Sequence, residues 1–292
     1  MDSSQAGNTR TAGTNLGGAK GYRPLEGKLA IITGASRGIG AAIAENLASK
    51  GANLVLNYTS DSSEALTKEL SKSLQDTHAI STLIVQADVS EKAGADHIVN
   101  TAKNHFSHPK TGKFQIDILI NNAGVAKNQY IPDIQIKDFE WCYKINVLGP
   151  ILMLQAAVDY LPHDRSGRIV NLSSVSSSKG FVGQTVYGGT KAAVDAMTRT
   201  WSRELNNRAT VNSVNPGPVA TDMWAGTTAG FKESVKPYNL TTPMAEVRPD
   251  VDDKELVDDP SEIAGIVGML CTPDSVWCTG QVVCANGGMV MR

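Results

Sequence analysis

Short apolar runs alternate with segments of helical spacing along most of the chain. The apolar runs, which predict strands, cover residues 29–32, 54–56, 81–87, 116–120, 167–172, 210–214 and 281–284. Apolar residues three and four positions apart predict helices over 39–50, 61–75, 91–106, 137–161, 184–207 and 260–271. The first strand segment is apolar throughout, which is typical of a strand buried on both faces.

This alternation predicts the fold class. Strands that alternate with helices favour parallel pairing through right-handed crossovers, because a parallel neighbour cannot be reached by a tight turn. We therefore expect an α/β protein with a Rossmann-like, doubly wound sheet of seven parallel strands and helices on both faces. No repeat and no second linker interrupts the pattern, so residues 24–292 are predicted to form one domain.

The segment ahead of this domain has a different character. Residues 1–23 are rich in Ser, Gly, Asn and Thr, with Leu16 and Tyr22 as the large apolar side chains. Such a segment buries too little apolar surface to offset the entropy lost on ordering. We predict a disordered N-terminal tail.

Composition and charge narrow the range of partners. The chain has 292 residues, 41% of them hydrophobic and 19% charged, as expected for one sizeable core. A formal net charge of −2 argues against nucleic acid and anionic membranes as partners. The sequence lacks an 18-residue apolar run and a secretory or transit pattern, so we expect a cytoplasmic protein without a membrane span.

The cysteines and histidines suggest no metal chemistry. The four cysteines contain no C-x-x-C pair, and we expect reduced, packed thiols. His105 and His108 form an H-x-x-H pair without a third ligand nearby, so no metal site is predicted.

A glycine-rich turn lies between the first predicted strand and the first predicted helix. Gly34, Gly38 and Gly40 give the spacing Gly-x-x-x-Gly-x-Gly. Glycine allows a tight turn and a close approach of the backbone to a pyrophosphate, and the free N–H groups of the following helix attract the phosphates. A purely structural turn is the alternative.

Further motifs follow in order along the chain. Asp88-Val89 follows the third strand, Asn121-Asn122-Ala123-Gly124 follows the fourth, Tyr187-x-x-x-Lys191 opens a helix and Asn215-Pro216-Gly217 follows the sixth strand. Together with the glycine turn, they resemble the short-chain dehydrogenase/reductase family from about Gly27 to Gly288. Within that family the chain looks most like ketoreductases of 3-oxoacyl or polyketide type.

The resemblance implies a dinucleotide site and assigns its residues. The residues that it places against the cofactor are Gly34, Ser36, Arg37, Gly38, Ile39, Gly40, Tyr58, Thr59, Ser60, Asp88, Val89, Asn122, Ala123, Gly124, Tyr187, Lys191, Pro216, Gly217, Val219 and Thr221.

The cofactor is predicted to be NADP(H). An NAD site usually ends its second strand with an acidic residue, whereas here the strand ends in Asn57-Tyr58-Thr59-Ser60 and the first carboxylate is Asp61. Arg37 in the glycine turn is suited to a 2′-phosphate, because a guanidinium matches phosphate geometry. A solvated Arg37 is the alternative.

A carbonyl reduction needs a hydride at carbon and a proton at oxygen, and Tyr187 is the predicted proton donor. Tyr187 and Lys191 are four residues apart in a predicted helix, so they share one face. A neighbouring ammonium favours phenolate, so we expect Lys191 to lower the pKa of Tyr187. The resemblance adds Ser174, which would bind the substrate oxygen, with Ser173 as a rival, and Asn146, which would hold a water in a proton relay.

The substrate side is the least determined. Residues 222–259 are expected to form a lid, whose Met223, Trp224, Phe231 and Tyr238 would give an apolar inner face or simply pack onto the core. The acidic stretch 250–259 is expected to be solvated surface. We predict NADPH-dependent reduction of a hydrophobic, polyketide-type, aromatic or 3-oxoacyl ketone, by a homotetramer or dimer. The alternatives are an oxidative alcohol dehydrogenase and a non-catalytic NADP-binding protein.

Overall fold

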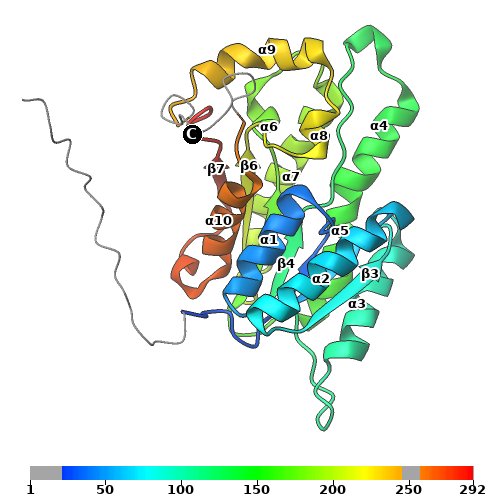
Figure 1. The fold of residues 1–292 in the computed structure, drawn as a ribbon, viewed down its shortest axis with the longest axis vertical. Helices are drawn as coiled ribbons and strands as arrows, with labels where there is room; N and C mark the ends of the chain where they lie inside the picture. The colour runs from blue at the N-terminus through cyan, green and yellow to red at the C-terminus, as the bar shows by residue number, and fades with distance from the viewer. Residues whose placement is uncertain (1–21, 245–256, 292) are drawn as a thin grey trace, which may run out of the picture.

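The computed structural model describes residues 22–244 and 257–291 and contains a sheet of seven parallel strands in the order β3-β2-β1-β4-β5-β6-β7 (Figure 1). The strands are β1 Leu29–Ile32, β2 Asn53–Tyr58, β3 Thr82–Gln86, β4 Ile118–Asn121, β5 Gly167–Leu172, β6 Ala209–Pro216 and β7 Val282–Ala285. The predicted Rossmann-like, doubly wound sheet is confirmed.

Helices cover both faces of the sheet. One face carries α1 Gly38–Ser49, α2 Glu64–His78 and α10 Pro260–Cys271, and Figure 1 shows α1 and α10 side by side. The other face carries α3 Lys92–Phe106, α5 Gly149–Ala157 and α7 Thr185–Glu204.

The strand residues alternate between these two layers. In β1, Ala30 and Ile32 belong to the core under α1 and α10, whereas Leu29 and Ile31 belong to the core under α3 and α5. Successive strand side chains point to opposite faces, so a strand covered on both sides is apolar at most positions. This is why β1 was recognisable as an uninterrupted apolar run.

The strand order reverses between β1 and β4. From β1 the chain proceeds outward to β2 and β3, then returns to β4 on the other side of β1 and continues to β7. Ligands of doubly wound sheets bind at such a switch point, beyond the carboxyl ends of the strands. The glycine turn and the Asn-Asn-Ala-Gly segment both leave this edge.

The long helix predicted over 137–161 is interrupted. It consists of α4 Ile136–Tyr143, a π-helical segment η3 Lys144–Leu148, α5, and a 3-10 turn η4 Val158–Tyr160. Three short helices around the substrate side were not predicted from the sequence: α6 Ser176–Lys179, α8 Asp222–Ala225 and α9 Ala229–Leu240.

The expectation that no helix could cross a membrane needs a correction. Ile136–Tyr160 is helical over 25 residues with a mean hydropathy of 1.2, so it is long and apolar enough by length and composition. The sequence did not suggest this helix as a candidate, because polar residues such as Asn146 interrupt the apolar run. The helix packs against α3 and α7, which gives it a place in the fold without a membrane.

The N-terminal tail, part of the lid, the cysteines and the absence of a metal site were also predicted from the sequence. The predicted disordered tail lies, except for Tyr22 and Arg23, outside the described residues, as do positions 245–256 of the lid and acidic stretch. All four cysteines are free thiols. Within the described ranges, no three His, Cys, Asp or Glu side chains are placed to hold a metal ion.

The end of the acidic stretch has a structural role that was not expected. Asp259 is the N-cap of α10: its carboxylate accepts a hydrogen bond from the backbone N–H of Ser261 at 2.8 Å, and the Glu262 side chain accepts from the Asp259 N–H at 2.9 Å. This reciprocal capping box satisfies N–H groups that a helix leaves without partners.

Replacing Asp259 by alanine should therefore lower the free energy of unfolding by about 1 kcal/mol, because the first turn of α10 loses its acceptor. Urea unfolding followed by far-UV circular dichroism measures the change. Asp76→Ala, which removes an exposed carboxylate from α2, is the matched control and should change stability by no more than about 0.5 kcal/mol. Equal losses in both variants would contradict the capping role.

Candidate active site

The glycine turn forms a cradle whose three glycine positions have no room for a larger side chain. Gly34 and Gly38 adopt φ values of +61° and +56°, the left-handed region that favours glycine. A Cβ on Gly40 would lie 2.2 Å from the Gly34 carbonyl oxygen. The turn ends at the N-terminus of α1, where the N-cap residue Arg37 makes no side-chain capping bond. The backbone N–H groups there suit a phosphate.

Asn122 and Thr33 tie this turn to the end of β4. The Asn122 side-chain amide donates hydrogen bonds to the carbonyls of Thr33 and Gly34, both at 2.9 Å. The Thr33 hydroxyl accepts from the backbone N–H groups of Asn122 and Ala123, both at 3.0 Å. The predicted cofactor residues Asn122 and Ala123 thus also fix the shape of the cradle.

Asn57, at the end of β2, braces the turn from the other side and was missed by the sequence analysis. Its side chain is fully buried, accepts from the Gly34 N–H at 3.3 Å and donates to the carbonyls of Tyr58, Val85 and Ala87. The available signal was a polar residue at the end of an apolar run, where a buried amide requires partners.

The residues predicted on the adenosine side follow β2 and β3. Thr59, Ser60 and Asp88 are exposed, and Val89 is buried. The Asp88 carboxylate accepts from the Ser90 N–H at 2.9 Å, so its orientation is fixed. Tyr58 differs from its neighbours because its side chain is only 5% exposed, and burial raises the pKa of its phenol. It can serve this side of the site mainly through its backbone.

Arg37 already has an ionic partner in the protein. Its Nε lies 3.2 Å from a carboxylate oxygen of Asp222, the first residue of α8. Beside this pair, a Cβ on Gly38 would lie 3.0 Å from the Thr221 methyl group. The glycine turn and the start of the lid are therefore in direct contact, which the sequence did not reveal.

Tyr187 and Lys191 occupy adjacent turns of α7, as predicted. The Lys191 Nζ is 5.7 Å from the centre of the Tyr187 ring and donates to the Leu172 carbonyl at 2.7 Å. Ser174 follows β5; its Oγ donates to the Ser176 Oγ and accepts from the Ser176 N–H, both at 3.1 Å. Its rival, Ser173, donates its hydroxyl to the Lys191 carbonyl at 3.3 Å, so that hydroxyl is engaged by the scaffold. The Ser174 hydroxyl is bonded within its own loop, so Ser174 stays the predicted substrate partner.

The pKa values of the two groups move in opposite directions. Burial raises the pKa of Tyr187 to about 12, while the hydrogen bond with Ser174 acts against this rise. Burial lowers the pKa of Lys191 to about 8, and Asp195 acts against this fall. The expected lowering of the Tyr187 pKa by Lys191 is wrong for this structure, because desolvation outweighs an ammonium that is turned toward Leu172.

Asn146 lies in the π-helical segment η3 and is 1% exposed. Its side chain accepts from the Val125 N–H at 2.8 Å and donates to the Val125 carbonyl at 2.8 Å and to the Thr190 hydroxyl at 3.0 Å. It therefore links the segment after β4 to α7. A Cβ on Gly124 would lie 3.3 Å from the Asn146 Oδ1 and 3.5 Å from the Lys191 Nζ, so these three predicted residues converge.

A cavity of about 130 Å³ opens beside Tyr187 and Ser174. Pro216, Gly217, Val219 and Thr221, predicted for the nicotinamide side, line it together with Ile39 of the glycine turn. Its lid wall contains Met223, Trp224 and Phe231 as expected. Tyr238 instead packs edge-on against Phe181, with ring centres 5.4 Å apart.

Four polar side chains in this cavity were not predicted: Asn128, Ser176, Gln184 and Thr227. Asn128 follows the Asn-Asn-Ala-Gly segment and Gln184 precedes α7, so both reach the cavity from loops. The wall is therefore amphiphilic and not simply apolar. Such a lining suits a substrate that carries hydrogen-bonding groups beside its reacting carbon.

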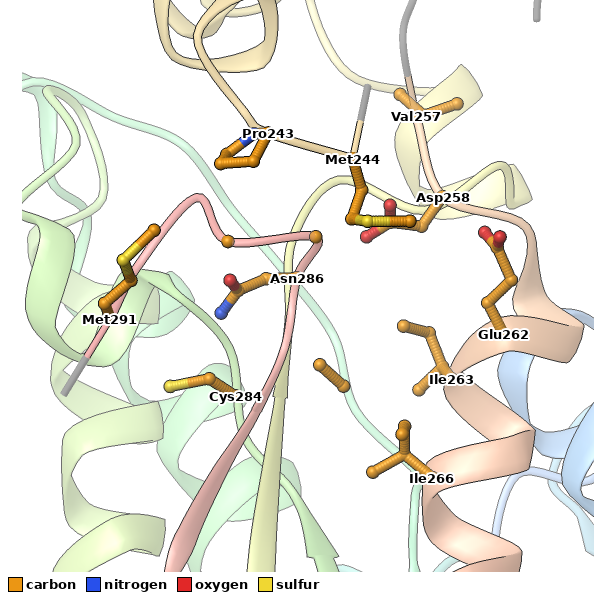
Figure 2. A pocket seen from close by; sticks show the side chains of 13 residues that line it. Pro243, Met244, Val257, Asp258, Glu262, Ile263, Ile266, Cys284, Asn286 and Met291 are labelled. Carbon is orange, nitrogen blue, oxygen red and sulfur yellow. The ribbon is translucent and has the colours of Figure 1, made fainter. Parts of the chain in front are cut away.

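A larger cavity of about 520 Å³ lies elsewhere, between the end of the lid, α10 and the C-terminal strand (Figure 2). Glu262, Ile263 and Ile266 of α10 face Cys284 and Met291 across it. None of the predicted catalytic residues lines this cavity. The predicted catalytic residues Ser174 and Tyr187 line the smaller cavity instead.

Comparisons with known proteins identify the sequence family of the chain. The sequence model of the short chain dehydrogenases matches residues 28–230. L-xylulose reductase of Aspergillus niger is 52% identical over 296 residues, covering 91% of this chain and 98% of the relative. L-xylo-3-hexulose reductase of Hypocrea jecorina is 48% identical over 299 residues, covering 92% and 98%.

Solved structures agree with this result. A blue fluorescent protein from a metagenomic library, crystallised with NADPH, superposes with a TM-score of 0.78 at 32% identity, covering 92% of this chain and 100% of that one. A short chain dehydrogenase of Burkholderia cenocepacia with NADP gives a TM-score of 0.77 at 26% identity, covering 91% and 99%. From the ordered motifs, the converging Tyr187, Lys191 and Ser174, and these matches, we conclude that the chain belongs to the short-chain dehydrogenase family and is an oxidoreductase of CH–OH and C=O groups.

Proposed function

We propose that the protein reduces a short ketose to a polyol with NADPH. The observation that carries this proposal is the polar wall of the cavity, where Asn128, Gln184 and Thr227 stand near Ser174 and Tyr187. The two relatives at 52% and 48% identity are named for reduction of sugars, which agrees with such a wall. A hydrophobic, polyketide-type, aromatic or 3-oxoacyl ketone, expected from the sequence, would bring no donor to the Gln184 Oε1, which has no protein partner among the described residues.

The protonation states favour reduction over oxidation. With a pKa of about 12, the Tyr187 phenol carries its proton at neutral pH and can donate it to a carbonyl oxygen. An oxidation would require the same group as phenolate. Ser174 donates a hydrogen bond to the developing oxyanion, and both donors are held before reaction begins, so little reorganisation is needed.

The cofactor is NADP(H), which supplies the hydride when bound. The cradle formed by Gly34, Gly38 and Gly40 suits the pyrophosphate. Arg37 is the cation placed for a 2′-phosphate, and β2 ends without a carboxylate that would repel it. In this proposal Lys191, which lies beside Gly124 and Asn146, holds the ribose hydroxyls of the nicotinamide half and returns a proton to Tyr187.

The oligomeric state and the cellular location stay predictions. Exposed apolar side chains, among them Ile131, Ile136 and Trp277 with 77%, 74% and 90% exposure, support a homo-oligomer, because such side chains gather at subunit contacts. The cytoplasmic location is a further proposal and rests on the sequence features given above.

Turnover across a ketone panel tests the proposed activity. NADPH oxidation should be fastest with ketoses such as L-xylulose and slower with aromatic ketones and 3-oxoacyl thioesters. Tyr187→Phe removes the proton donor and should lower kcat by about 10² to 10⁴-fold while NADPH binding, followed by its fluorescence, is retained. Faster reduction of aromatic ketones than of any ketose would contradict the proposed substrate, and full activity of Tyr187→Phe would contradict the proton donor.

Arg37→Ala should weaken the preference for NADPH. A hydrogen bond to a charged group contributes about 1.5–3 kcal/mol, so KM for NADPH should rise roughly tenfold to a hundredfold while KM for NADH stays nearly constant. Arg203→Ala, which removes an exposed arginine from α7, is the charge-matched control. An unchanged ratio of the two KM values would show that the 2′-phosphate is bound elsewhere.

The pH profile should depend on Lys191. Below pH about 8 both Lys191 and Tyr187 are protonated, and as pH rises through that value Lys191 loses its charge while Tyr187 keeps its proton. We expect kcat/KM for ketone reduction to fall about tenfold per pH unit above pH about 8. Lys191→Arg keeps a cation at all these pH values. Its residual activity should lack this alkaline decline, and an identical decline in the variant would assign it to another group.

A further inference from the structure

Gln184 lies on the same wall of the cavity as the proton donor. It is the N-cap residue of α7 and precedes Tyr187 by one helical turn, so the two side chains share a face of the helix. The residue is 9% exposed and lines the cavity together with Ser174 and Tyr187.

The orientation of Gln184 is fixed from two directions. Its side-chain nitrogen donates to the Asn128 Oδ1 at 3.2 Å. Its backbone carbonyl accepts from the Gly188 N–H at 2.7 Å, and the adjoining residue Gly183 accepts from the Gln129 N–H at 2.8 Å, forming a short parallel bridge. Neither the main chain nor the amide can turn without breaking one of these bonds.

The remaining polar atom of this side chain has no protein partner. In the part of the chain that the structure describes, no donor reaches the buried Gln184 Oε1. A buried acceptor without a hydrogen bond costs about 1–3 kcal/mol, so native proteins rarely leave one without a ligand or water to fill it. The oxygen of Gln129 is also without a partner, but Gln129 does not line the cavity.

We propose that Gln184 is a specificity-determining residue whose Oε1 accepts a hydrogen bond from a substrate hydroxyl close to the reacting carbonyl. The inference rests on the proposed ketose reduction and deepens it. Ser174 and Tyr187 hold the carbonyl oxygen, and the fixed amide one turn earlier on α7 meets the neighbouring part of the substrate. In a ketose that part carries hydroxyl groups, which are the donors that the amide oxygen lacks.

The same contact excludes ketones without hydroxyl groups. An aliphatic or aromatic ketone brings no donor, so the buried Gln184 Oε1 would stay without a partner. Sites built to bind a hydroxyl discriminate strongly against analogues that lack it for this reason. Asn128, which bonds to Gln184 through its own oxygen, is a positioning residue for this contact.

A comparison of two substrates in one set of variants tests the proposal. L-xylulose provides the hydroxyl groups, and 2,3-pentanedione provides a five-carbon ketone without them. In Gln184→Met, which keeps the side-chain length but not the acceptor, the ratio of kcat/KM for L-xylulose to that for the diketone should fall about tenfold to a hundredfold. Gln184→Glu, which keeps an acceptor oxygen, should restore part of this ratio. Asn128→Ala should lower it by less than Gln184→Met does.

The control is Gln281→Met, which removes an exposed amide just before β7, away from the cavity, and should leave the ratio unchanged. NADPH binding, measured by fluorescence, reports that each variant is folded. An equal loss with both substrates, or no loss with either, would overturn the role of Gln184 while L-xylulose turnover by the wild type leaves the proposed function standing. A wild-type enzyme that reduces the diketone but no ketose would overturn the proposed function and this inference together.

Discussion

The site depends on the hydrogen bonds by which Asn122 holds the glycine turn to the end of β4. Strands β1 and β4 are neighbours at the point where the strand order reverses, and their connections leave in opposite directions. Without a cross-link, the carboxyl ends of the two strands would splay. The amide of Asn122 and the hydroxyl of Thr33 instead join four backbone groups in a small, partly buried network, so the cradle is formed by the protein itself.

A second set of hydrogen bonds connects this fixed segment to α7, the helix that carries Tyr187. Val125, just beyond the fixed segment, is bonded at both backbone groups by Asn146, whose amide also reaches Thr190 on α7. The π-helical segment holds one extra residue per turn compared with an α-helix. This extra residue changes the direction of the Asn146 side chain, which therefore points toward α7. The position of Tyr187 is thus linked to the cradle through buried amides and not through apolar packing alone.

The sequence revealed the parts of this structure that depend on local order. The strand Leu29–Ile32 was evident because burial on both faces favours an uninterrupted apolar run, and Tyr187 and Lys191 were evident because helical spacing places them together. Asn57 and Gln184 were missed, since their roles arise from contacts between distant segments. The pKa of Tyr187 was predicted in the wrong direction because spacing reports the nearby charge but not the burial that outweighs it.

The contact between the glycine turn and α8 has a consequence for how this enzyme can vary. Arg37 faces Asp222, and Thr221 packs on Gly38 while also lining the substrate cavity. Given the proposed roles of Arg37 at the 2′-phosphate and of Thr221 in the cavity, this one wall would serve two recognition tasks. Cofactor choice and substrate choice would then be coupled, so a protein engineer, or natural selection, would have to alter them as a pair.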